Sequence, residues 1–171
     1  MSEDVKRTAA TSGVEIGVEK QVEKLARMQR KTKKTIFKVL DGLVKMAEDL
    51  EHTETLKGSC GHCTGCYNGG FEENSVRIAD NLAVMHYNTC YRTPAILYRD
   101  DNSIDNIDPR LWKILAFTDY KDEWKLNRAT GKAASILVHE IEKAPEYIRR
   151  KGERLEELDQ ELEKIAEVLE V

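Results

Sequence analysis

The sequence predicts an all-α fold: long N- and C-terminal helices form an antiparallel coiled coil or helical bundle, and a small helical middle carries a cysteine-rich metal-binding loop. Three observations lead to this prediction. Apolar residues recur at heptad spacing near both ends of the chain, the two heptad segments carry opposite charge, and only three prolines occur among 171 residues. Charged residues make up 34% of the chain, against about 25% in an average soluble domain.

The first element expected is a long basic helix over residues 14–52, after a disordered lead-in over residues 1–13. Apolar side chains follow alternating steps of four and three, which is typical of a coiled-coil seam or a long bundle helix. The residues that carry this pattern are Val18, Val22, Leu25, Ile36, Val39, Leu43, Met46 and Leu50, with Gln29 and Thr32 in two polar slots. A helix over residues 18–50 would be about 50 Å long.

The last element expected is an acidic heptad helix over residues 145–171, with Pro145 in its first turn. Residues 20–46 hold nine basic side chains against two acidic ones, whereas residues 153–171 hold eight acidic side chains against two basic ones. Complementary charge of this kind selects helix partners and their orientation. The charges therefore predict that the two helices pair, within one chain or between two copies.

The middle of the chain is expected to be helical within the same domain, which spans residues 14–171. A cysteine-rich loop and helix are predicted over residues 58–92, the helix opening near residue 74 or 75 and ending at Thr93-Pro94. A helical middle is predicted over residues 93–144, in which "AILYR" is a short strand or an extended link. Asp108-Pro109 predicts the start of a helix with the core sequence "RLWKILAF", and further helices are expected near residues 119–128 and 132–143.

Four cysteines form the candidate metal site. Cys60, Cys63 and Cys66 follow the spacing C-x2-C-x2-C inside a glycine-rich stretch, and Cys90 is the only other cysteine of the chain. The triple spacing is that of the bacterial ferredoxin run, in which thiolates bind a [4Fe–4S] cluster. Five of the ten glycines surround these residues, and they would allow the tight turns that such a loop needs.

Zinc is the competing metal, because it also binds to four cysteines or to three cysteines and a histidine. His62 and His86 could supply a nitrogen in that case. The c-type haem motif is excluded because Cys63 is followed by Thr64 rather than by histidine. No Ser-His-Asp pattern, phosphate-binding glycine loop or H-E-x-x-H motif is present, and the sequence leaves open whether the protein is an enzyme.

The sequence thus predicts an iron–sulfur protein in electron transfer or in redox or oxygen sensing, as a subunit or regulator of a larger complex. The alternative is a zinc-stabilised coiled-coil interaction module that contacts nucleic acid through the basic stretch from Arg30 to Lys34. A protein partner or a homo-oligomer would form through the heptad helices. The net charge of −4 argues against a nucleic-acid partner. The lack of an apolar span or signal segment predicts a cytoplasmic protein without a membrane partner.

Overall fold

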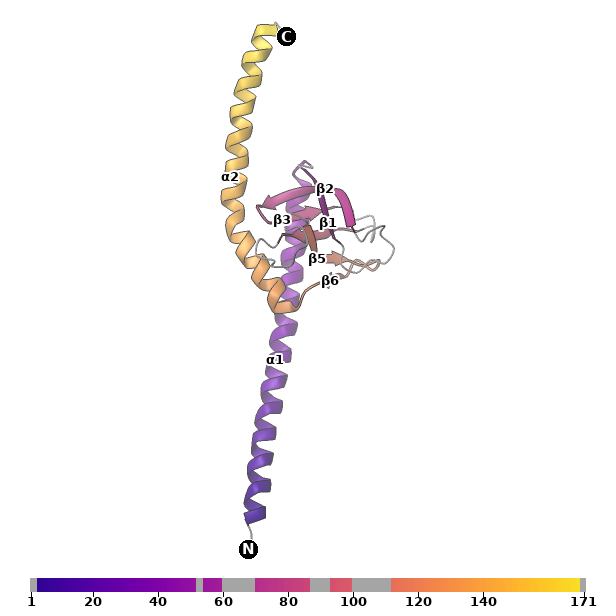
Figure 1. The fold of residues 1–171 in the computed structure, drawn as a ribbon, viewed down its shortest axis with the longest axis vertical. Coiled ribbons are helices and arrows are strands. Elements are labelled where there is room, and N and C mark those ends of the chain that lie inside the picture. The colour runs from indigo at the N-terminus through magenta and orange to yellow at the C-terminus, as the bar shows by residue number, and fades with distance from the viewer. Residues whose placement is uncertain (1–2, 52–53, 60–69, 87–92, 100–111, 170–171) are drawn as a thin grey trace.

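The chain folds as a mixed α/β structure, in which two long helices flank a closed β-barrel (Figure 1). This computed structural model describes residues 3–51, 54–59, 70–86, 93–99 and 112–169, with side chains from residue 17 onward. The elements in chain order are α1 (Glu3–Glu48), β1 (Glu54–Ser59), β2 (Gly70–Ala79), β3 (Leu82–Met85), β4 (Ala95–Tyr98), β5 (Trp112–Thr118), β6 (Trp124–Leu126) and α2 (Thr130–Leu169).

The strands form a meander in which each strand pairs antiparallel with the next. Four antiparallel pairings lead from β1 to β5, and because this number is even, the two strands run in the same direction. They pair in parallel through Gly58 with Trp112 and Ser59 with Lys113, and this pairing closes the barrel. The strand β6 continues the sheet beyond β5 as the second strand of a hairpin.

Gly58 is required at the closure of the barrel. A Cβ at this position would lie 2.2 Å from the carbonyl oxygen of Trp112 and 2.3 Å from Cζ of Phe71. Real side chains do not approach backbone this closely, so only glycine lets β1 and β5 pair here. This glycine was expected in the cysteine-rich loop and helix over residues 58–92, whereas it lies in strand β1.

Two hydrophobic cores hold the fold together. The barrel interior is filled by Leu56, Phe71, Ala83, Met85, Ala95, Leu97, Trp112 and Ile114. A larger core lies between the outer face of the sheet and the helices, and its members include Val76, Ile78, Val84 and Ile96 of the sheet, Leu40 and Leu43 of α1, and Leu137 of α2. The strands β3 and β4 are buried on both faces, because one face lines the interior and the other contacts the helices.

The predicted all-α fold class is therefore wrong, and the error lies in the middle of the chain. The helix expected after residue 74 is replaced, in the described residues, by β2 and β3, which are joined by a turn at Asp80 and Asn81. The helix expected over "RLWKILAF" is replaced by β5 from Trp112 onward, although its residues are core as expected. Residues 119–126 form the turn and strand of the β5–β6 hairpin rather than a helix. Of the two readings of "AILYR", the strand is confirmed as β4.

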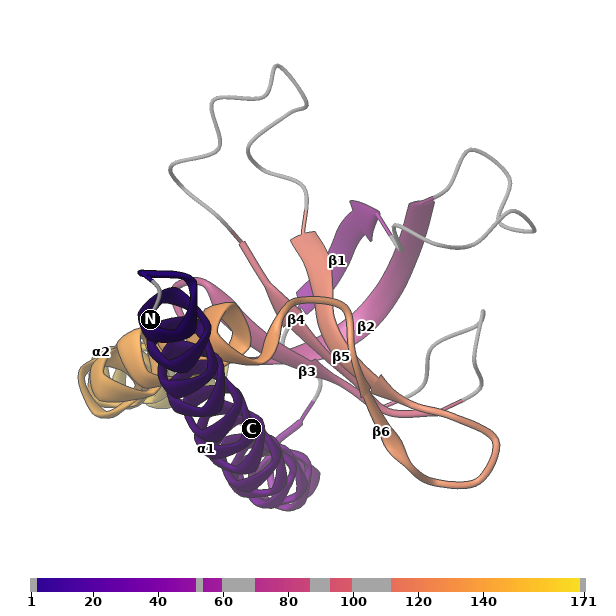
Figure 2. The same cartoon turned by 90° about the horizontal axis from the view of Figure 1, so that it is seen from below.

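The two long helices exist, but they do not form the predicted coiled coil or helical bundle. The helix α2 begins at Thr130, and Pro145 lies inside it rather than in its first turn. Figure 1 shows that α1 and α2 both pass the barrel and that their outer halves leave it in opposite directions, and Figure 2 shows both helices on the same side of the barrel. The basic and acidic segments of one chain therefore do not lie side by side. Neither described helix is long and apolar enough to span a membrane.

The second half of α1 packs against the barrel. Ile36, Leu40, Leu43 and Ala47 are buried against the sheet and α2. The indole Nε1 of Trp124 in β6 donates a hydrogen bond of 2.6 Å to Oδ1 of Asp41. This bond supplies the buried indole N–H with the polar partner that it needs.

Candidate functional site

One end of the barrel carries the connections that contain all four cysteines. In a meander, the connections leave alternate ends of the sheet, so the β1–β2 and β3–β4 connections share one end. The register agrees with this, because Ser59 at the end of β1 pairs with Gly70 at the start of β2, and Met85 pairs with Ala95. Cys60, Cys63 and Cys66 belong to the first connection and Cys90 to the second.

The cysteines themselves lie outside the described residues. Within the described part of the chain, no group of three or more His, Cys, Asp or Glu residues is arranged to hold a metal ion. His86, the second histidine considered as a ligand, directly follows β3 at the cysteine-bearing end and is half-buried. His62 lies outside the described residues, as do Asp108-Pro109.

The barrel interior below this end is filled with apolar side chains. Met85 and Ala95, the last and first residues of their strands, are both fully buried. Small barrels of this kind have just enough interior for their own side chains. A cofactor held at this end would therefore sit on the connections, outside the barrel, and the strands would act as a rigid base for them.

The opposite end of the barrel holds a cluster of cationic and aromatic side chains. The guanidinium of Arg77 in β2 lies 5.4 Å from the ring of Trp112 and 5.9 Å from the ring of Tyr147 in α2. It also forms an ion pair of 3.2 Å with Glu54 and donates a hydrogen bond of 2.7 Å to the carbonyl oxygen of Asp80. Each of these contacts joins a different element, so Arg77 binds β1, the β2–β3 turn, β5 and α2 together.

Tyr147 is the residue of α2 that enters this cluster. Its ring is buried, and burial raises the pKa of its hydroxyl above the ordinary value, with smaller opposing effects from Arg77 and Arg150. One helical turn further, Arg150 forms an ion pair of 2.9 Å with Asp80. The cluster is best explained as the anchor of α2 on the barrel. The sequence alone does not reveal this cluster, because its residues come from four separate elements.

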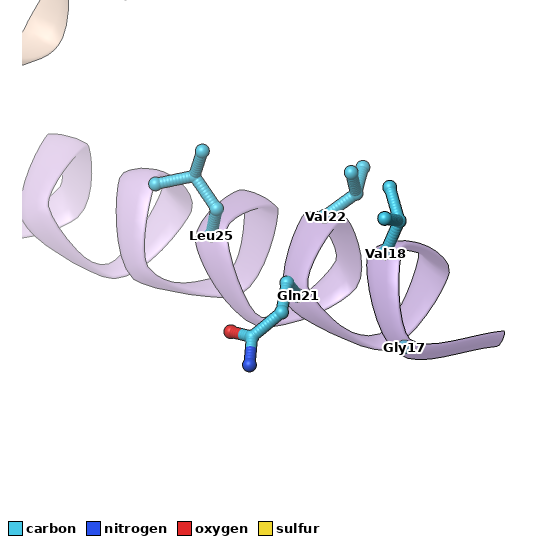
Figure 3. A pocket seen from close by; sticks show the side chains of 5 residues that line it. All are labelled: Gly17, Val18, Gln21, Val22 and Leu25. Carbon is cyan, nitrogen blue, oxygen red and sulfur yellow. The ribbon is translucent and has the colours of Figure 1, made fainter. Parts of the chain in front are cut away.

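Beyond the barrel, each helix exposes a stripe of apolar side chains. We define the α1 arm as residues 17–35 and the α2 arm as residues 152–169; nearly all of their residues are exposed. In the α1 arm, Val18, Val22 and Leu25 are each more than half exposed, and Figure 3 shows them on one side of the helix with Gln21 on the other. In the α2 arm the stripe consists of Leu155, Leu158, Leu162, Ile165 and Leu169.

The arms carry equal and opposite charge. The α1 arm has seven basic and two acidic residues, a net charge of +5, and the α2 arm has seven acidic and two basic residues, a net charge of −5. Lys31 and Lys33 flank the stripe position Thr32, and Glu161 and Glu163 flank Leu162. None of these four charges takes part in an ion pair within the described part of the chain.

A comparison of the chain with known protein families, with curated proteins and with solved structures finds no match to any of them. The class of the protein is therefore defined by its own fold and surfaces. It is a closed five-stranded barrel with a cysteine-bearing end and two helical arms of opposite charge.

Proposed function

We propose that this chain is an iron–sulfur protein, which binds a [4Fe–4S] cluster through Cys60, Cys63, Cys66 and Cys90 and acts in electron transfer or in redox or oxygen sensing. The observation that supports the proposal best is the strand order. It brings the β1–β2 connection and the β3–β4 connection to the same end of the barrel, and these connections contain every cysteine of the sequence. The β1–β2 connection would supply three thiolate ligands and the β3–β4 connection the fourth.

The donor set fits the chemistry of the cluster. A [4Fe–4S] cluster takes four thiolates, and three of them at C-x2-C-x2-C spacing are typical of bacterial ferredoxins. When bound, such a cluster supplies one-electron redox chemistry, at a potential that depends on hydrogen bonds to its sulfurs and on its exposure. The glycines of the first connection would let backbone N–H groups approach the thiolates, and the filled barrel offers a rigid support.

Anaerobic purification with iron and sulfide analysis tests the proposal. About four irons and four sulfides per chain are expected, with the brown colour of thiolate-to-iron charge transfer. A colourless protein with stoichiometric zinc and no iron would contradict the cluster and support the alternative, a zinc-stabilised interaction module.

The fourth ligand is tested separately. Cys90→Ser is expected to lower the iron content per chain, or to leave a cluster that is rapidly lost in air, because one thiolate is missing. His86→Ala, which changes a residue on the same connection, serves as the control and is expected to retain the cluster. Full, stable cluster loading in Cys90→Ser would show that another group supplies the fourth bond.

A further inference from the structure

The arms of a single chain cannot pair with each other. The α1 arm leaves the barrel at one end of the long axis of the molecule and the α2 arm at the other end (Figure 1). Each apolar stripe is nonetheless exposed, with Leu25 at 56% and Leu162 at 61% of full exposure. Their occupant therefore has to come from another molecule.

Each exposed stripe continues a stripe that is already buried. In α1, the steps of three and four that connect Val18, Val22 and Leu25 lead on to Ile36 and Leu40, which pack on the barrel. In α2, the corresponding steps lead from the buried positions that end at Tyr147 to the exposed positions that begin at Leu155. Most of the stability of a helix in water comes from packing of such a face, and short helices without it are marginal. The arms thus have the pattern of helices that are packed along their whole length.

Charge decides which helix fits each arm. Two α1 arms side by side would bring +5 against +5, and two α2 arms would bring −5 against −5. An α1 arm beside an α2 arm brings opposite charges together, and the lysines next to Leu25 and Thr32 would meet the acidic residues next to Leu158 and Leu162. The complement of each arm is therefore present on a second copy of this chain.

We propose that two copies of this chain form a closed two-fold dimer, in which the α1 arm of each copy lies antiparallel to the α2 arm of the other. The opposite directions of the arms make this closure possible. A copy that is rotated by 180° about an axis perpendicular to the long direction of the molecule points its α2 arm along the first copy's α1 arm, and its α1 arm along the first copy's α2 arm. One association then covers all four stripes, as expected for an isologous interface.

The geometry of the paired arms is self-consistent. The α1 arm has 19 residues and the α2 arm has 18, so at 1.5 Å per residue both arms are about 27–28 Å long and match in length. The α1 arm runs toward its barrel and the α2 arm runs away from its own, which makes the pair antiparallel in the rotated arrangement. The dimer does not involve the cysteine-bearing end of the barrel, and the proposal is independent of any cofactor there.

Light scattering coupled to size-exclusion chromatography tests the dimer. The unchanged protein is expected to elute with twice the mass of one chain at tens of micromolar concentration. A monomer at this concentration would overturn the proposal. A mass that rises past two chains with concentration would show open head-to-tail pairing and would overturn the closed two-fold arrangement.

Charge reversal identifies the surfaces that pair. The basic-arm variant carries Lys24→Glu and Lys33→Glu, and the acidic-arm variant carries Asp159→Lys and Glu161→Lys. Each variant alone is expected to be monomeric, because like charges then border both stripes of every arm pair. An equimolar mixture is expected to give a mixed dimer, in which one arm pair is native and the other has its charges exchanged. Monomers in the mixture, or dimers of either variant alone, would contradict the pairing of unlike arms.

The matched control has the same change of charge on the other side of the same arm. Arg27 and Lys34 are seven residues apart on the helix face opposite Leu25. The double variant Arg27→Glu and Lys34→Glu is expected to remain a dimer. Its dissociation into monomers would show that only net charge matters and would overturn the assigned interface. Circular dichroism verifies that every variant retains its helices.

Discussion

Gly58 shows how much of this fold depends on a single residue. A Cβ atom at this position would clash with the carbonyl oxygen of Trp112 and with the ring of Phe71. Both contacts belong to the closure of the barrel, where β1 and β5 are joined by the pairs Gly58–Trp112 and Ser59–Lys113. The backbone at Trp112 cannot move away without giving up this pairing.

Gly58→Ala is therefore expected to lower the free energy of unfolding by about 2–3 kcal/mol or more, as overpacking against backbone does. Urea unfolding followed by circular dichroism measures the change. Gly42→Ala in α1 is the control, since a Cβ there meets nothing within 4 Å, and it should stabilise the protein by about 0.5–1 kcal/mol through helix propensity. Equal stability of Gly58→Ala and the unchanged protein would contradict the steric account.

Among the elements, α2 depends on the cluster around Tyr147 for its position on the barrel. The cluster contains the charges of Arg77, Glu54, Asp80 and Arg150, and burial of the ring raises the pKa of Tyr147. A tyrosine whose pKa is higher in the folded state keeps its proton in that state at pH values where the unfolded chain has lost it. Its contribution to stability is full below the unfolded pKa of about 10 and is lost as the pH rises through the folded value.

The free energy of unfolding is thus expected to fall as the pH rises above about 10, the ordinary pKa of tyrosine, and to fall less steeply in Tyr147→Phe. Urea titrations at a series of pH values provide the measurement. Tyr120→Phe is the control, because Tyr120 is 86% exposed and its removal should leave the slope unchanged. Identical slopes for Tyr147→Phe and the unchanged protein would show that the ring does not titrate differently in the two states.

The long helices could be predicted from the sequence, whereas among the strands only "AILYR" was offered as one, beside the reading as an extended link. The heptad pattern of α1 and α2 is visible in the sequence because one face of each helix is apolar and the other is charged. The strands β3 and β4 read as the apolar runs "LAVM" and "AILY" because both of their faces are buried, and such runs show neither a period of two nor one of 3.6. The Asp80-Asn81 turn was the local signal that could have favoured a hairpin.

The candidate site was predictable only as a set of residues. The C-x2-C-x2-C spacing points to Cys60, Cys63 and Cys66, but it does not tell where Cys90 lies relative to them. That relation depends on the strand order, which is decided by tertiary pairing. The same holds for the arms, since opposite charge indicates pairing but not whether the partner is the same chain.

At the scale of the whole molecule, the arms make the protein far longer than its length in residues suggests. A compact chain of 171 residues has a radius of gyration of about 16 Å. The helix α1 alone, with 46 residues, extends for about 70 Å. Since α2 leaves the barrel in the other direction, the mass is spread along one axis (Figure 1).

Small-angle scattering of the monomeric charge-reversed variants is therefore expected to give a radius of gyration at least about 1.5 times the compact value of about 16 Å. A chain that ends at residue 152 serves as the control and should give a smaller radius, because it lacks the α2 arm. A radius near the compact value for the full chain would mean that the arms fold back on the barrel.

The closure of the barrel lies next to the first cysteine in the chain. Gly58 and Ser59 form the parallel pairing with β5, and Cys60 follows them directly. A ligand that holds Cys60 in one position favours the register in which these two residues are paired, and thermodynamic linkage requires the reverse as well: a closed barrel raises the affinity for that ligand. Binding of a ligand at Cys60 and folding of the barrel would thus be coupled in this protein. Loss of the ligand would first weaken the pairing between β1 and β5.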